Sequence, residues 1–205
     1  GPEQHGFMVA VGYELYCRLL EQAVETMKGK KIEKKENTGP RIDLQVNAYL
    51  PSTFVANQQQ KIDLYRRIAT LENKEELKDM AEELKDRYGR LQPPVENLLL
   101  VMRLRQLAKE INVESIEQQK DQIIVKFNQE KSFESNRLWE LVNRHRKKVS
   151  LHAGKKISLR IKSKFLKDKE QQELEYIINI LEEIRANELE KEEGEGEKWK
   201  RELKF

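Results

Sequence analysis

The hydrophobic residues of this chain follow two different periods, and that mixture restricts it to folds that contain both helices and strands. Between about residues 58 and 111, apolar side chains recur every three or four positions, which predicts helices. Further along, residues 123–127 and 157–161 alternate between apolar and polar, which is typical of half-buried strands. We therefore predict an α+β protein in which a small, mostly antiparallel sheet packs against several helices.

The clearest element boundaries surround the helix predicted at 73–88. Asn73 is a candidate N-cap with Glu76 three residues later, Gly89 follows the last apolar position, and Pro93-Pro94 opens the next helix. Helices are predicted at 7–28, 58–71, 73–88, 94–111, around 138–142 and at 168–186, and strands at 42–49, 113–117, 123–127, 148–151 and 157–161.

Composition shifts divide the chain into four parts. The helix within residues 1–28 is an outlying element, because the segment at 29–41 is rich in charge and glycine and predicts an exposed linker. Residues 42–187 contain the remaining periodic segments and are expected to form one domain. The tail at 188–205 is charged and contains glycine, so we expect it to be disordered.

Charge and cysteine content exclude several classes of protein. The 205 residues contain 39 Lys and Arg against 36 Asp and Glu, so a uniformly basic coat for nucleic acid is absent. The single cysteine, Cys17, excludes an intramolecular disulfide and a multi-cysteine zinc site. No apolar run approaches the ~18 residues of a membrane span, and no secretory signal opens the sequence. We predict a reduced, cytoplasmic protein without a membrane partner.

The sequence predicts neither catalytic residues nor a cofactor. No phosphate-binding glycine motif occurs, and His5, His145 and His152 lack the spacing of metal ligands. His145 and His152 flank a basic run and are expected to be solvated. Cys17 has no nearby histidine to act as its base, so an inert thiol is expected. We predict no metal site, and no ATP hydrolysis by this chain.

A basic segment at 144–169 contains eleven Lys and Arg and one acidic residue, Asp168. Such a segment could contact the phosphates of a nucleic acid. The alternative is that strands place these cations on a solvated sheet face, balanced by the acidic helix that follows. The candidate phosphate contacts are Arg144, Arg146, Lys147, Lys148, Lys155 and Lys156.

An acidic segment at 72–86 contains seven Asp and Glu and three Lys. At 100° per residue, Asp86 lies directly opposite the apolar stripe of this helix, with Glu83 and Arg87 on the same outward flank. An ordinary solvated helix face would give the same pattern. Because these side chains are predicted to point away from the core, truncating Glu83 and Asp86 is expected to leave stability within about 0.5 kcal/mol.

Several segments, in this order, resemble the bacterial transcription-repair coupling factors. Near the start, Gln4 and Gly6 match the close of the TRG motif, a translocation element shared with the RecG helicase. The segments that carry the resemblance are EQHGFMVAVGYELYCRLLEQAV at 3–24, DLQVNAYLPSTFV at 43–55, QKIDLYRRIA at 60–69 and EELKDRYGRLQPPVENLLLVMRLR at 82–105.

The resemblance implies a DNA translocase of many domains, of which this chain is an excised fragment. The intact protein would use ATP and magnesium in motor lobes to push stalled RNA polymerase along duplex DNA, and would recruit the excision-repair subunit UvrA. Residues 1–28 would be the end of a motor lobe and its exit helix, with Gln4 and Gly6 as remnants of the motor motif. Residues 42–187 would be the C-terminal regulatory domain.

The resemblance also implies that this C-terminal domain is autoinhibitory. It would dock on the N-terminal UvrB-like module and mask the surface that binds UvrA. Glu83, Asp86 and Arg87 match positions of interdomain polar contacts, so the resemblance implies that they form an interdomain latch. The alternative that stays open is a nucleic-acid-binding accessory module that uses residues 144–169.

Overall fold

The computed structural model describes residues 39–128, 135–154, 156–163 and 169–202. The predicted N-terminal helix, the motor-motif residues Gln4 and Gly6, His5, Cys17, Lys155 and most of the predicted linker lie outside these residues. The domain that begins near residue 42 is therefore the part of the chain whose predictions the structure tests.

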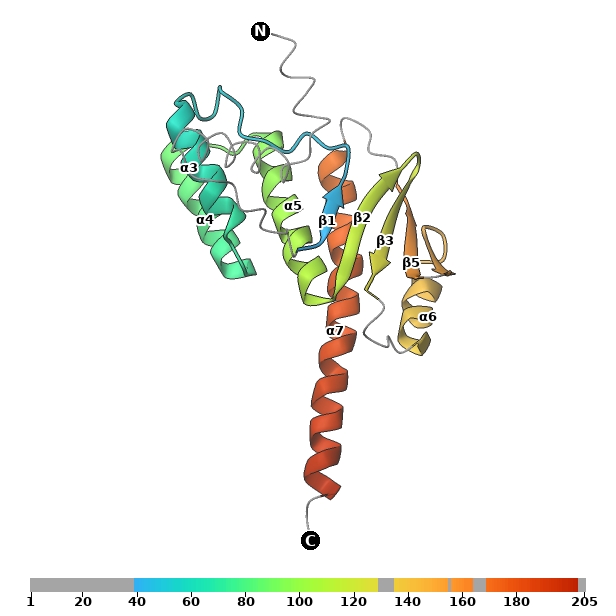
Figure 1. Cartoon of the computed structure of the whole chain (residues 1–205). Coiled ribbons are helices and arrows are strands. Elements are labelled where there is room, and N and C mark those ends of the chain that lie inside the picture. The colour runs from blue at the N-terminus through green and yellow to red at the C-terminus, as the bar shows by residue number, and fades with distance from the viewer. Residues whose placement is uncertain (1–38, 129–134, 155, 164–168, 203–205) are drawn as a thin grey trace, which may run out of the picture.

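Within the described residues, five strands form one sheet in the order β1-β2-β3-β5-β4 (Figure 1). The strands are β1 (Arg41–Asp43), β2 (Val113–Gln119), β3 (Gln122–Phe127), β4 (Val149–Ala153) and β5 (Ile157–Lys162). Only β1 runs parallel to its neighbour, β2, and the other pairs are antiparallel. The α+β class and the mostly antiparallel sheet are therefore confirmed.

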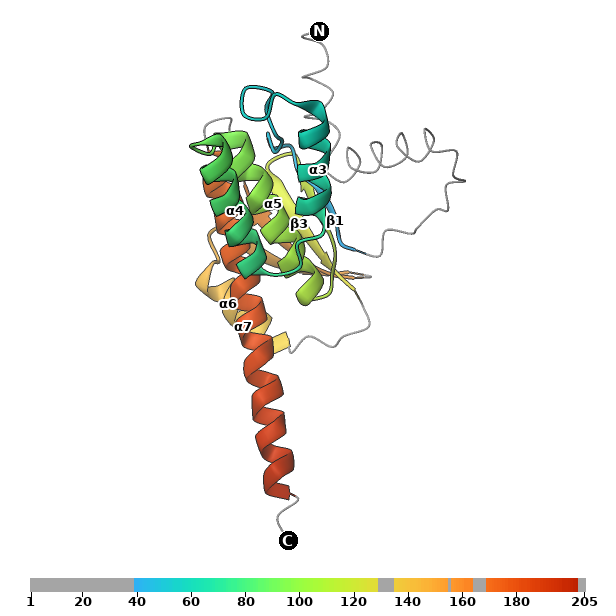
Figure 2. The ribbon, with the colours of Figure 1, turned by 90° about the vertical axis from the view of Figure 1, so that its left-hand side faces the viewer.

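The described helices are α3 (Gln58–Ala69), α4 (Lys74–Tyr88), α5 (Pro93–Glu110), α6 (Ser135–Arg144) and α7 (Glu170–Glu202). Figure 1 shows α5 and α7 between the sheet and the pair α3–α4, with α6 at the other end of the molecule. In both Figure 1 and Figure 2 the C-terminal part of α7 projects beyond the rest of the domain.

Helix α5 lies between two hydrophobic cores, which explains why its sequence is apolar on nearly every side. Leu98 and Met102 belong to the core shared with α3 and α4. Leu104 and Leu107 belong to the core shared with the sheet, α6 and α7. A helix that is apolar all round is a buried helix, and α5 therefore joins the two halves of the domain.

The boundaries predicted for α4 are confirmed, with one difference in the cap. Asn73 accepts a hydrogen bond from the Glu76 N–H at 2.9 Å, as an N-cap does. The Glu76 carboxylate accepts from the N–H of Glu72 at 2.7 Å, one residue before the cap. At the other end, Gly89 has φ of 83° and donates its N–H to the Lys85 carbonyl, a conformation that favours glycine.

The strand predicted at 42–49 was wrong in its extent, because β1 ends at Asp43. Asp43 pairs with Glu117, and the turn from β2 into β3 begins only three residues later. Beyond Asp43, β2 therefore offers too few residues for the pairing to continue. The Gln45 N–H then donates to the side chain of Gln118. Apolar alternation continues without a ladder, since Leu44 and Val46 are still buried in the core.

A buried carboxylate fixes the segment that leaves β1. Glu170, the first residue of α7, is 9% exposed and accepts from the N–H and Nδ2 of Asn47, at 3.2 and 2.7 Å. Asn97 of α5 also donates its Nδ2 to Glu170, at 2.9 Å, and to the Asn47 carbonyl. One side chain therefore ties α7 to α5 and to the path that leads into α3.

The last helix is longer than predicted. The sequence indicates an end near Ala186 and a disordered tail at 188–205, whereas α7 continues to Glu202. Glu and Lys dominate residues 188–202 and have good helix propensity. That propensity accounts for a helix where hydrophobic periodicity had ended.

Candidate interdomain docking surface

Glu83 is held within its own domain by two arginines. Arg67 of α3 donates from Nη1 and Nη2 to the two carboxylate oxygens, at 2.7 and 2.5 Å. Arg87, one turn along α4, donates from Nη1 at 2.9 Å. The contact with Arg67 is the bidentate geometry in which guanidinium–carboxylate pairs are strongest, so Glu83 fastens α4 to α3.

The electrostatics of this cluster follow from that geometry. The hydrogen bond from Arg67, with a further one from Arg87, lowers the pKa of Glu83 from 4.5 to about 2, against the opposing effect of burial. The same hydrogen bond with Glu83 raises the pKa of Arg67. Glu83 and Arg67 are therefore charged at every physiological pH, and together with Arg87 they form a fixed ionic network.

Asp86 and Arg87 complete the outward face of α4, under which Leu77 and Leu84 are buried. Asp86 is exposed, and no described residue pairs with its carboxylate. The Arg87 guanidinium lies 5.3 Å from the centre of the Tyr88 ring. We call Arg67, Glu83, Asp86 and Arg87 the α4 surface. It combines two cations with two anions, so a partner would recognise its hydrogen-bonding pattern rather than an excess of charge.

The prediction that Glu83 is dispensable for stability was wrong in its premise. Helical periodicity correctly placed Asp86 outward, but it does not indicate that α3 lies alongside the flank that carries Glu83. The missed residue is Arg67, in the last turn of α3 and sixteen positions before Glu83. Two adjacent arginines, Arg66 and Arg67, beside an acidic helix were the available signal.

The change Glu83→Gln is expected to destabilise the domain by about 1 kcal/mol at pH 7, near the upper end for exposed ion pairs. The melting temperature should fall by about 2–4 °C. Because the pKa of Glu83 is lowered from 4.5 to about 2 on folding, its contribution is complete above pH 4.5 and is lost as the pH falls toward 2. Thermal unfolding measured between pH 7 and pH 2.5 should show this convergence.

Glu82→Gln is the matched control for that experiment. The Glu82 carboxylate is 64% exposed, and its ion pair with Lys78 is long at 3.9 Å. Its loss should therefore change stability by less than about 0.5 kcal/mol. A constant difference between Glu83→Gln and the parent at all pH values would mean that the ion pairs of Glu83 contribute nothing, and that the glutamine merely packs badly.

The structure does not assemble the five described candidate phosphate contacts into one surface, and the sixth, Lys155, lies outside the described residues. Arg144 pairs with Glu183 at 3.3 Å, the Lys148 ammonium lies 4.6 Å from the Tyr176 ring centre, and Lys156 pairs with Glu114. Lys156 and Lys148 also lie at opposite ends of β4, about 16 Å apart at ~3.3 Å per residue. Arg146 and Lys147 are exposed, and no described acidic group pairs with them.

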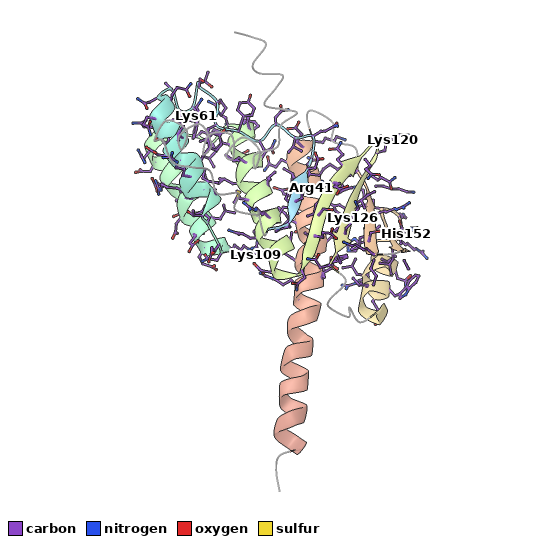
Figure 3. All side chains as sticks on the ribbon, in the orientation of Figure 1. Arg41, Lys61, Lys109, Lys120, Lys126 and His152 are labelled. Atoms are coloured by element: carbon purple, nitrogen blue, oxygen red, sulfur yellow. The ribbon has the colours of Figure 1, made fainter. Side chains whose placement is uncertain are left out.

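The outward face of the sheet neutralises part of its own charge. Glu117 accepts from Arg41 at 2.6 Å and from Lys126 at 3.0 Å, and Figure 3 shows both cations on the sheet. Burial opposes ionisation of Glu117, but hydrogen bonds from Lys126 and Ser115 and the charges of Lys126 and Arg41 lower its pKa. This part of the sheet therefore fits the solvated-face alternative.

His145 differs from its prediction as a solvated side chain, whereas His152 is exposed at the edge strand as expected (Figure 3). The Nε2 atom of His145 lies 2.9 Å from Glu183, and Nδ1 lies 3.3 Å from the Tyr176 hydroxyl. Both partners are on α7, so His145 docks the end of α6 on that helix. The pairing is over 30 residues distant in sequence, so local spacing gave no sign of it.

Across the described ranges, no group of three or more His, Cys, Asp or Glu side chains could hold a metal ion. Nor does any described helix combine the length and apolar character that a membrane span requires. What the described side chains do provide is the α4 surface.

Comparisons with known proteins agree with this architecture. A family model described as the TRCF domain matches residues 44–138. The transcription-repair-coupling factor of Bacillus subtilis is 37% identical over 170 residues, which cover 80% of this chain and 14% of that protein. The Rickettsia typhi protein of the same name is 29% identical over 157 residues, covering 77% and 14%. The chain thus spans about one seventh of the length of these relatives.

A solved structure gives the same result for the fold. The crystal structure of the C-terminal domain of a transcription-repair coupling factor aligns with a TM-score of 0.63 and 25% identity. The alignment covers 73% of this chain and 95% of that domain. Residues 44–138 therefore match the TRCF domain family, and the described residues have the fold of the C-terminal domain of a transcription-repair coupling factor.

Proposed function

We propose that this domain is an autoinhibitory lid in a DNA translocase that couples transcription to excision repair. The α4 surface would dock on the N-terminal UvrB-like module of the same protein and mask the surface that binds UvrA. The observation that carries this proposal is Asp86, a carboxylate with no described partner, held beside the fixed Arg67–Glu83–Arg87 network. The TRCF family and the fold of its C-terminal domain support it.

In this proposal Glu83 would have a different role in the latch from the one that the sequence implied. Its oxygens are occupied by Arg67 and Arg87, so Glu83 would orient the two guanidinium groups rather than meet the partner directly. The outer N–H groups of both arginines would donate to acceptors on the UvrB-like module, and Asp86 would accept from a cation there. Because this pattern is fixed before docking, little side-chain entropy is lost on binding.

The remaining activities would belong to other parts of the intact protein. ATP and magnesium would bind in motor lobes, and RNA polymerase and duplex DNA would be engaged by further domains in the cytoplasm. UvrA would be an indirect partner, since it competes for the masked surface. This domain is not proposed to be an enzyme, and an assay for DNA-stimulated ATP hydrolysis should give no rate above background.

The test is a binding competition between three separate proteins. This chain, immobilised, is expected to retain the isolated N-terminal UvrB-like module, and added UvrA is expected to displace it. Retention that UvrA does not affect would place the docking site away from the UvrA surface and contradict masking. No retention, by a chain that is folded by circular dichroism, would contradict the docking itself.

A further inference from the structure

Trp139 stands out because a large aromatic side chain is exposed on a helix that already has a buried apolar side. Leu138, Leu141 and Val142 of α6 are buried in the core with the sheet and α7. Trp139 is 53% exposed, and it is the one large hydrophobic side chain of the described residues that is exposed to this degree. The core does not need this indole, so its position calls for another explanation.

Exposed polar groups follow Trp139 toward the end of α6. The helix ends at Arg144, and the His145 N–H closes its last turn by donating to the Leu141 carbonyl at 3.0 Å. At 100° per residue Asn143 lies one turn beyond Trp139 on the same side of α6, and Arg146 and Lys147 follow in the turn at 145–148. All four are exposed. We call these four residues the Trp139 flank.

The two sides of α6 differ in how their charge is balanced. On the side toward α7, Glu183 pairs with Arg144 and His145. On the Trp139 flank, no described carboxylate pairs with Arg146 or Lys147. The flank therefore presents an aromatic face, an amide and two cations without a described partner, with the exposed carboxylate of Glu140 directly after Trp139.

We propose that the Trp139 flank binds single-stranded nucleic acid. The indole would stack on one base, Arg146 and Lys147 would contact the adjoining phosphates, and Asn143 would add a hydrogen bond. Stacking on an aromatic side chain combined with cations that follow the backbone is the general mode of single-strand binding. A protein partner fits less well, because interface cores need a larger apolar area and the described surface offers no second exposed large hydrophobic side chain.

This site is separate from the α4 surface. In Figure 1, α6 lies at the opposite end of the molecule from α3 and α4. Both surfaces could therefore be occupied at once, and the inference goes beyond the proposed lid. An Asp86→Ala variant should bind single strands as the parent does, so failure of one proposal does not decide the other.

The experiment measures binding of a fluorescein-labelled 12-nucleotide oligo-dT to the full chain by anisotropy at two salt concentrations. Trp139→Ala should weaken binding by roughly 5- to 100-fold, whereas Trp139→Phe should retain most of it. Arg146→Ala with Lys147→Ala should reduce the salt slope by about 0.7 for each phosphate that is no longer neutralised. In a Trp199→Phe background, Trp139 is the remaining tryptophan, and its fluorescence should be quenched by the oligonucleotide.

The matched control removes two exposed cations elsewhere, Lys85 and Arg90, with the same change in net charge. Equal weakening by this control pair would overturn the proposal, because it would reduce the binding to general electrostatics. Competition by a poly-glutamate peptide at the same concentration as oligo-dT would also overturn it, and would assign the flank to an acidic protein segment. Unquenched Trp139 fluorescence at saturation would exclude the stacking contact.

Discussion

Replacing Asp86 with alanine in the full-length protein should allow UvrA to bind without RNA polymerase. If Asp86 meets a cation on the UvrB-like module in a dry interface, its truncation strands that cation and costs about 2–5 kcal/mol of docking energy. Each 1.4 kcal/mol is a factor of ten, so the ratio of closed to open protein should fall between about 30- and several-thousand-fold. UvrA affinity, measured on immobilised full-length protein, should rise correspondingly.

The stability of the domain provides the second readout of that experiment. Asp86 is exposed and has no described partner, so Asp86→Ala should change the free energy of unfolding by less than about 0.5 kcal/mol. Glu140→Ala on α6 removes another exposed carboxylate, at the far end of the molecule, and should leave UvrA binding unchanged. A folded Asp86→Ala protein with unchanged UvrA affinity would show that the lid does not depend on this carboxylate.

Glu83 is a less suitable target for the same purpose. Its removal breaks the contact with Arg67 between α3 and α4, in addition to any effect that it has on docking. A Glu83 variant that released UvrA could therefore do so because α4 had moved. Asp86 separates the two effects, and that choice follows from the structure rather than from the sequence.

The features that the sequence predicted well depend on local rules. Side-chain period distinguishes helix from strand, and caps such as Asn73 and Gly89 act on the turn beside them. For that reason the helices α3 to α6 and the four strands β2 to β5 were placed within a few residues. The outward direction of Asp86 is equally local, because it follows from 100° per residue on one helix.

The features that were missed depend on which elements are neighbours in space. Glu83 of α4 pairs with Arg67 of α3. His145 contacts Tyr176 and Glu183, which lie 31 and 38 positions later in the sequence. The length of β1 is limited by where β2 turns, although its own sequence continues to alternate. A single sequence contains no direct signal for such contacts, so charge pairing between helices could only be recognised once the fold was known.

Glu170 should be the residue whose loss destabilises the domain most among its charged side chains. Glu170→Ala would remove the acceptor of the Asn47 N–H and of the Asn47 Nδ2, and would leave Asn97 Nδ2 with the Asn47 carbonyl alone. An unsatisfied buried donor costs about 1–3 kcal/mol. We expect a loss of about 3 kcal/mol, and at about 2–4 °C per kcal/mol a fall in melting temperature of about 6–12 °C.

Glu170→Gln tests whether the carboxylate acts as an acceptor rather than as packing volume. Glutamine keeps one acceptor oxygen at nearly the same size, so it should recover about half of the lost stability, with thermal melts by circular dichroism as the measurement. Glu175→Ala removes an exposed carboxylate from the same helix and should change stability by less than about 0.5 kcal/mol. If Glu170→Ala melted like Glu175→Ala, water would be satisfying the amides of Asn47 and Asn97, and the junction between α7, α5 and the segment after β1 would be held by its apolar contacts alone.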